Sequence, residues 1–282
     1  MGKNTQQSRS NWAAFPHANK AFEYTPDGLK KAWPALHKGD CEPFPSLARI
    51  KALDPDHPDP KAASEAMIEA WCCYHAGDFS RAVEMAEEVG LVAHTIANKA
   101  SGIYADYLED DESAQLAIYE EGMARAQSAI DAFPNDPNAH YFHAFMTGRY
   151  SQCISMAKAL KDGLAGRVKT DVLHTLDLAP KHAEAWLALG LFHAEVINKV
   201  GKMVGGVTYG ASANESMAAF EKALKLTPKA PIAWIEYGNG LYLLYGDKKL
   251  DESNEAYLKA SQLKPTDAME KLDVEYALKS IT

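Results

Sequence analysis

Ala223-Leu224-Lys225-Leu226-Thr227-Pro228 is the end of an amphipathic helix, and variants of it recur at intervals of about 45 residues. The other copies are residues 129–134 (AIDAFP), 175–180 (TLDLAP) and 260–265 (ASQLKP). Proline stops each helix, because it has no backbone N–H and its ring clashes with the preceding turn. Since one helix pair cannot bury its own apolar face, self-similarity at this period predicts a solenoid of stacked pairs.

The fold class that follows is all-α, a solenoid of antiparallel helix pairs, because no segment shows the alternating pattern of a strand. Helices are expected near residues 61–76, 79–89, 91–108, 113–133, 138–147, 151–160, 163–178, 182–198, 212–226, 230–245, 249–263 and 267–280.

The N-terminal part is expected to be a degenerate cap. Residues 1–60 comprise a polar arm and a helix pair, the first helix starting at Thr25-Pro26-Asp27 and the second stopped by Asp54-Pro55. The proline-rich linker at residues 54–60 separates this cap from the solenoid, which takes residues 61–282 and ends in a C-terminal capping helix.

Two units carry residues that resemble the signature of the tetratricopeptide (TPR) repeat. In the first they are Trp186, Leu189, Gly190, Phe220, Ala223 and Pro228, and in the second Trp234, Tyr237, Gly238, Tyr257, Ala260 and Pro265. The resemblance implies that Gly190 and Gly238 let the first helix of a repeat (helix A) approach the second (helix B) closely.

The turns between the two helices are longer than in the TPR pattern, notably at Asn198–Ala211. With these long turns, the chain from about residue 137 onward is similar to the TPR-like domain of the regulator-of-microtubule-dynamics proteins and their bacterial relatives. It is more distantly similar to the TPR accessory protein of periplasmic substrate transporters. The four glycines of the Asn198–Ala211 turn disfavour a continuous helix, and Val204, Val207 and Tyr209 are expected to pack it beside the groove.

The charge is uneven. The chain carries 29 Lys and Arg against 38 Asp and Glu, a net charge of −9, and residues 61–136 alone hold 4 basic and 15 acidic residues. Repulsion disfavours nucleic acid as a partner of this acidic part. The acidic block either keeps a helix face solvated or docks a basic partner.

No apolar run reaches the roughly 18 residues of a membrane span, so no integral membrane segment is expected. The polar N-terminus lacks the apolar core of a signal peptide, which predicts a cytoplasmic protein. The oligomeric state is not predicted.

Signatures of catalysis are not found. The four cysteines, Cys41, Cys72, Cys73 and Cys153, show no CxxC spacing, and we expect buried, reduced thiols. His140 and His143 are three apart and could share a metal with a neighbouring carboxylate, but no second ligand pair accompanies them. We expect no metal, no cofactor and no enzyme activity.

A TPR solenoid lines its concave groove with helix A residues at the second, fifth, ninth and twelfth repeat positions. The residues we assign to the groove are His140, His143, Thr147, Tyr150, Glu184, Leu187, Leu191, Ile232, Ile235, Asn239 and Tyr242. This mixture of apolar, aromatic and neutral polar groups suits an extended or helical peptide with apolar anchors.

The predicted function is therefore a non-enzymatic scaffold or adaptor that holds a protein or peptide segment. Two alternatives stay open at this point: a carrier of a lipid or other apolar small ligand, and a groove filled by a terminal helix of the same chain. The sequence names neither the partner nor the pathway.

Overall fold

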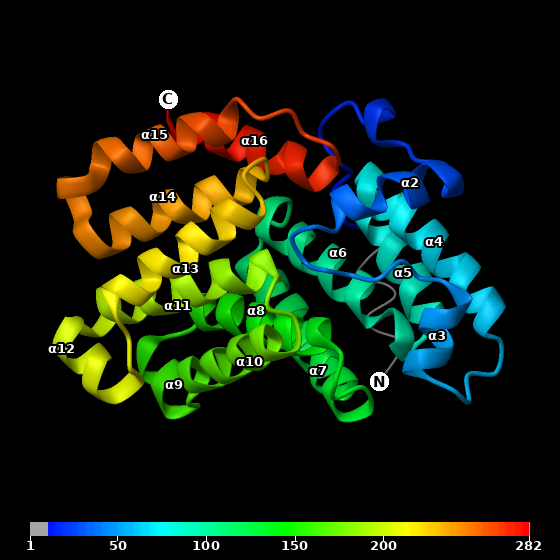
Figure 1. The fold of residues 1–282 in the computed structure, drawn as a ribbon, viewed down its shortest axis with the longest axis horizontal. Helices are drawn as coiled ribbons and strands as arrows, with labels where there is room; N and C mark the ends of the chain where they lie inside the picture. Colours follow the sequence, from blue (N-terminus) through cyan, green and yellow to red (C-terminus); the bar gives the residue numbers. More distant parts are fainter. Residues whose placement is uncertain (1–10, 282) are drawn as a thin grey trace. The chain divides into compact units, whose positions relative to one another are not determined.

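Helices account for all the regular structure in residues 11–281, which are the residues that the computed structural model describes (Figure 1). This confirms the all-α prediction. The chain forms two compact units, each described here by itself. Among the described residues, unit 1 comprises residues 11–36, 42–153 and 267–269, and unit 2 comprises residues 37–41, 154–266 and 270–281. The predicted boundary at residue 60 stays a prediction.

Unit 1 is built from seven helices and two short 3₁₀ turns. The helices are α2 (Pro26–Leu36), α3 (Leu47–Leu53), α4 (Pro60–Ala76), α5 (Phe79–Val89), α6 (His94–Tyr107), α7 (Glu112–Ala132) and α8 (Pro137–Cys153), and the turns are η1 (Lys20–Phe22) and η2 (Leu91–Ala93). Asp59, Asp78 and Asp111 start three of the helices, because each carboxylate accepts a hydrogen bond from a free backbone N–H of the first turn.

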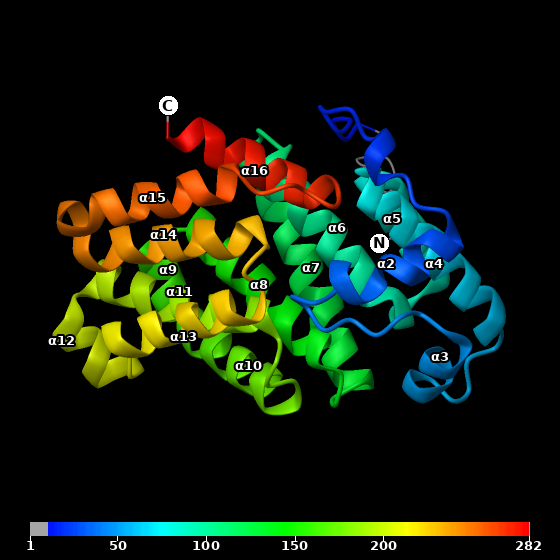
Figure 2. The same ribbon diagram turned by 45° about the horizontal axis from the view of Figure 1, so that its top comes forward.

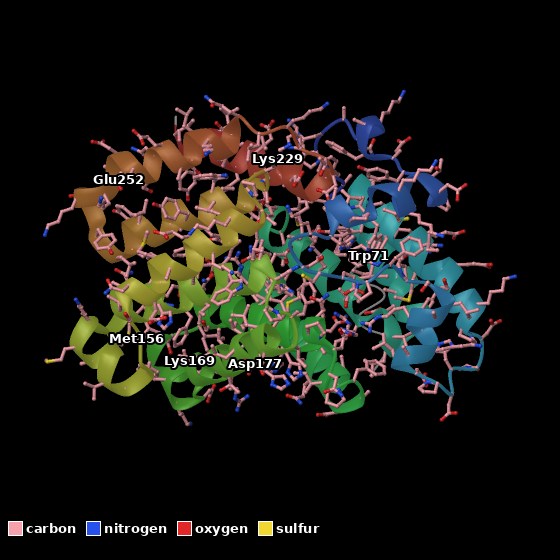
Figure 3. The ribbon with its side chains drawn as sticks, viewed as in Figure 1. Trp71, Met156, Lys169, Asp177, Lys229 and Glu252 are labelled. Carbon is pink, nitrogen blue, oxygen red and sulfur yellow. The ribbon has the colours of Figure 1, made fainter. Side chains whose placement is uncertain are left out.

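The predicted N-terminal cap packs on α4. Trp33 of α2 meets Trp71 of α4 edge to face, with ring centroids 5.5 Å apart, and Trp71 meets Tyr74 in the same way at 5.2 Å. Trp71 (labelled in Figure 3) is fully buried. Within unit 1 each helix from α4 to α8 packs against the next one along the chain, as stacked pairs require.

Unit 2 continues the pattern. Its elements are α9 (Met156–Lys161), α10 (Leu164–Leu178), α11 (Ala183–Val200), α12 (Lys202–Val204), the π-helical turn η3 (Gly205–Tyr209), α13 (Ala213–Leu226), α14 (Pro231–Tyr245), the 3₁₀ turn η4 (Gly246–Lys249), α15 (Leu250–Ser261) and, from residue 270, α16 (Ala268–Ser280). Helix α11 packs against α13 and α14, and α14 runs beside α15 (Figure 2).

Both predicted close approaches are present in unit 2. A Cβ placed on Gly190 would lie 2.8 Å from the Phe220 ring, and one placed on Gly238 would lie 3.0 Å from the Tyr257 ring. A serine of helix B also donates to each glycine carbonyl, Ser216 to Gly190 at 2.7 Å and Ser253 to Gly238 at 2.8 Å. The signature glycines therefore set the spacing between the helices of these two repeats.

Two local predictions need correction. Helix α8 continues to Cys153, whereas we expected it to end at residue 147 and a new helix to start at 151. The helix does break in the Asn198–Ala211 turn, as expected, at Gly201 (φ +82°) and Gly210 (φ +63°), although residues 202–209 between these glycines are helical. However, Val204 and Val207 are exposed, and only Tyr209 packs against the α11 side chains of unit 2.

Candidate partner-binding surface on the first helices of the repeats

A repeated hydrogen bond defines the register of the repeats. The indole Nε1 of Trp186 donates to the carbonyl oxygen of Pro180 at 3.0 Å, and Trp234 donates to Pro228 at the same distance. In unit 1 the Nε2 of His140 lies 2.8 Å from the Pro134 carbonyl oxygen. Each ring comes six residues after the proline that stops the preceding helix. His140 is thus the equivalent of the two tryptophans, at the fourth repeat position.

This equivalence corrects our assignment on α8 by two residues, since we had placed His140 at the second position. The α8 residues equivalent to the predicted ones on α11 and α14 are Asn138, Tyr141, Phe145 and Gly148. Counting six residues from Pro134 would have found this register in the sequence. The side chain of Asn138 makes an internal hydrogen bond, because its Nδ2 donates to the Glu42 carboxylate at 2.6 Å.

The four α8 residues that we assigned to the groove are interior side chains. His140, His143 and Tyr150 are each 7% exposed, and Thr147 is fully buried. An aromatic anchor must offer its ring to a partner, so the predicted role of Tyr150 gains no support from its burial.

On unit 2 the predicted residues divide into core and surface. Leu187 lies in the core between α11, α13 and α14, together with Phe220, Ala223 and Ala233. Ile235 is covered by Ala260 of α15 and Ala277 of α16. At this one position a terminal helix of the same chain does fill the predicted groove, as the second alternative supposed.

The remaining five residues are accessible and lie on two neighbouring helices. Glu184 and Leu191 of α11 are half-buried, as are Ile232 and Asn239 of α14, whereas Tyr242 is 52% exposed. Of these, Tyr242 offers the largest free aromatic surface. We call these five residues the unit 2 face.

Two members of the unit 2 face have fixed polar groups. The backbone N–H of Glu184 donates to the Gly39 carbonyl at 3.1 Å, so residues 37–41 border this end of the face. Asn239 donates to the Glu236 carboxylate at 2.8 Å and accepts from the Tyr257 hydroxyl. Because a side-chain amide has two N–H donors, one donor of Asn239 is left for a partner.

The cysteines do not have the properties of nucleophiles. Burial raises the pKa of Cys72 to about 11, and burial likewise raises the pKa of Cys41, Cys73 and Cys153. The reactive thiolate is therefore disfavoured at neutral pH. None of the four is in a disulfide. Our expectation that all are buried is wrong for Cys153, which is exposed, and the other three are half-buried.

Within residues 11–281, no group of three or more His, Cys, Asp or Glu side chains is arranged to hold a metal ion. Over the same part of the chain, none of the helices has the length and apolar character needed to cross a membrane.

Comparison with known protein families identifies a family for this chain. The family model described as regulator of microtubule dynamics protein 1-3 matches residues 82–274, which is more than half of the 282 residues. The match runs from α5 into α16 and includes every long turn of the repeats. No curated protein matches the chain.

Proposed function

The chain belongs to the family of regulator of microtubule dynamics proteins 1-3, and from that premise we propose that it is a non-enzymatic adaptor that holds a peptide or protein segment. The unit 2 face is the surface proposed to bind it. This interpretation narrows the predicted groove to the residues whose side chains a partner can reach.

The observation that carries the proposal is the exposure of Tyr242 beside half-buried neighbours. Tyrosine is enriched among the residues that dominate interface energies, since it buries a large ring and keeps a polar tip. Leu191 and Ile232 supply apolar edges, and Asn239 supplies its free N–H donor. No residue of the face is basic and only Glu184 is acidic, so binding should weaken only modestly with salt.

The family description favours a protein partner that acts on microtubules. We place the adaptor in the cytoplasm as part of the same proposal, because the family description names microtubules, which lie in that compartment. The acidic residues of the 61–136 segment make nucleic acid an unfavourable partner for that part.

The test compares truncation of an exposed side chain in the face with truncation of one outside it. Tyr242→Ala should reduce recovery of the partner from native lysate by about tenfold or more, because truncating a central aromatic anchor costs 2 kcal/mol or above. Leu278→Ala, which truncates a 46% exposed apolar side chain on α16 outside the face, is the control and should leave recovery unchanged. Quantitative mass spectrometry of the captured proteins measures both.

Loss of the same proteins from both variants, or from neither, would contradict the assignment of the face. Extraction of the purified chain separates the proposal from its alternative. A lipid present at one mole per mole of protein, unaffected by Tyr242→Ala, would favour the apolar-ligand carrier.

A further inference from the structure

Within unit 1, the segment before α2 (residues 11–22) packs against α4 and α6 through two aromatic anchors, and none of its residues belongs to the unit 2 face. The first anchor is Trp12, whose ring stacks on that of Tyr104 of α6 with centroids 3.9 Å apart and planes within 4°. The backbone N–H of Ala13 donates to the Tyr104 hydroxyl at 3.1 Å, and that hydroxyl donates to the Glu109 carboxylate at 3.1 Å. Tyr104 therefore holds this segment through both its ring and its hydroxyl.

The second anchor is Phe15, which fills a slot at the end of α4. Gly77 caps this helix in the left-handed region (φ +88°), and a Cβ there would lie 2.6 Å from the Phe15 ring. Only glycine leaves this space open and also adopts this backbone conformation without strain. Just beyond, the Asn19 side chain donates to the carbonyl oxygen of Ala76 at 3.2 Å.

Between the two anchors the segment lies at the surface and is not part of the core. Trp12 and Phe15 are half-buried, whereas Ala13, Ala14 and Pro16 are exposed, and residues 12–16 adopt neither helix nor sheet. Two spaced aromatic side chains packed on a folded domain are one way in which short peptides bind.

The charges of the segment and the surface are complementary. Within residues 11–22 the segment carries one basic residue, Lys20, and no acidic one. The part of unit 1 that provides Tyr104 and Gly77 lies in the 61–136 segment, with 15 acidic against 4 basic residues. Attraction between the two favours this arrangement over an arm released into solvent.

We propose that Tyr104 and Gly77 form a recognition site for peptides with a Trp-x-x-Phe spacing, and that the chain occupies this site in cis with Trp12–Phe15. The segment is then an intramolecular inhibitor of the site. A protein partner with the same spacing and basic flanking residues would have to displace it. Because the tether keeps the segment at a local concentration of about millimolar, a peptide in trans binds wild type weakly.

The experiment uses the full chain and a fluorescent peptide of residues 11–20 (NWAAFPHANK). The double variant Trp12→Ala with Phe15→Ala empties the site, and fluorescence polarisation should show at least about tenfold tighter peptide binding than to wild type. Adding Tyr104→Ala to the double variant should abolish that binding. A peptide with both aromatics replaced by alanine is the matched control and should not bind.

Equal binding to wild type and the double variant, or binding to neither, would overturn the proposal. Binding that survives Tyr104→Ala would overturn the assignment of the site. Hydrogen exchange of wild type provides a second measurement that needs no variant. Excess unlabelled peptide should speed exchange at residues 12–20 at least about tenfold while α4 stays protected, and unchanged exchange there would also overturn the proposal.

Discussion

Glycine at the eighth position of helix A determines how closely the two helices of a repeat can pack. Gly190→Ala should destabilise the protein by roughly 1–3 kcal/mol, because the added Cβ would lie 2.8 Å from the buried Phe220 ring, which must shift. Gly148→Ala is the matched control, since it also lies inside a helix but its Cβ would meet nothing within 4 Å.

The control should stabilise by up to about 1 kcal/mol, because alanine is the better helix former. Urea unfolding followed by circular dichroism measures both. A Gly190→Ala variant as stable as Gly148→Ala would refute the close approach.

His193 links stability to pH in unit 2. Burial, together with the positive charge of Lys169, lowers the pKa of His193 below its ordinary value of 6.5. The neutral ring is required because its Nδ1 accepts the Ser212 backbone N–H at 3.3 Å, just before α13. As the pH falls, the unfolded chain therefore takes up this proton before the folded chain does.

The contribution of His193 is thus complete above about pH 6.5 and is lost as the pH falls from there toward the folded pKa. Between about pH 7.5 and 5.5, the free energy of unfolding of wild type should fall more steeply than that of His193→Gln. Denaturant titrations at several pH values test this, and parallel profiles would exclude the coupling.

At the scale of the element, the turn between α11 and α13 has an attached base and a free tip. Tyr209 packs against the buried cluster of Phe192, Val196 and Ala211, and its carbonyl accepts a 2.8 Å hydrogen bond from Lys169 of α10 (labelled in Figure 3). The tip of the turn is exposed to solvent, since Val207 is 87% exposed.

Tyr209→Ala should therefore lower the free energy of unfolding by about 1–2 kcal/mol, through loss of these apolar contacts. Val207→Ser should change it by less than about 0.5 kcal/mol, because a substitution on the exposed tip removes no packing. Thermal unfolding compares the two variants, and equal effects would mean that the turn is attached along its whole length.

At the scale of the whole molecule, stacked repeats transmit a perturbation mainly to their neighbours. Gly190→Ala should speed amide exchange in α11, α13 and α14 of unit 2 far more than in α4–α7 of unit 1, because only the former share the disturbed core. Hydrogen exchange read by mass spectrometry provides the comparison. An equal acceleration in both units would show that the chain opens as one cooperative body.

Much of the architecture could be predicted from local signals. Pro134, Pro180 and Pro228 each stop a helix through the missing N–H of proline, and Gly190 and Gly238 mark close packing because only glycine leaves room for the opposing ring. These effects act within a few residues or within one helix pair, so the sequence by itself determined the all-α class, the repeat period and most helix boundaries. The register of α8 could also have been predicted, from the six-residue spacing between Pro134 and His140.

Exposure was decided by the tertiary structure alone. Ile235 and Tyr242 lie on one helical face, yet α15 and α16 bury the first and leave the second open. Trp12 and Phe15 read as part of a polar arm, but they dock on partners that come much later in the chain, the Ala13–Tyr104 hydrogen bond alone spanning 91 positions. Burial depends on which distant segments pack over a side chain, so it cannot be predicted from the local sequence pattern.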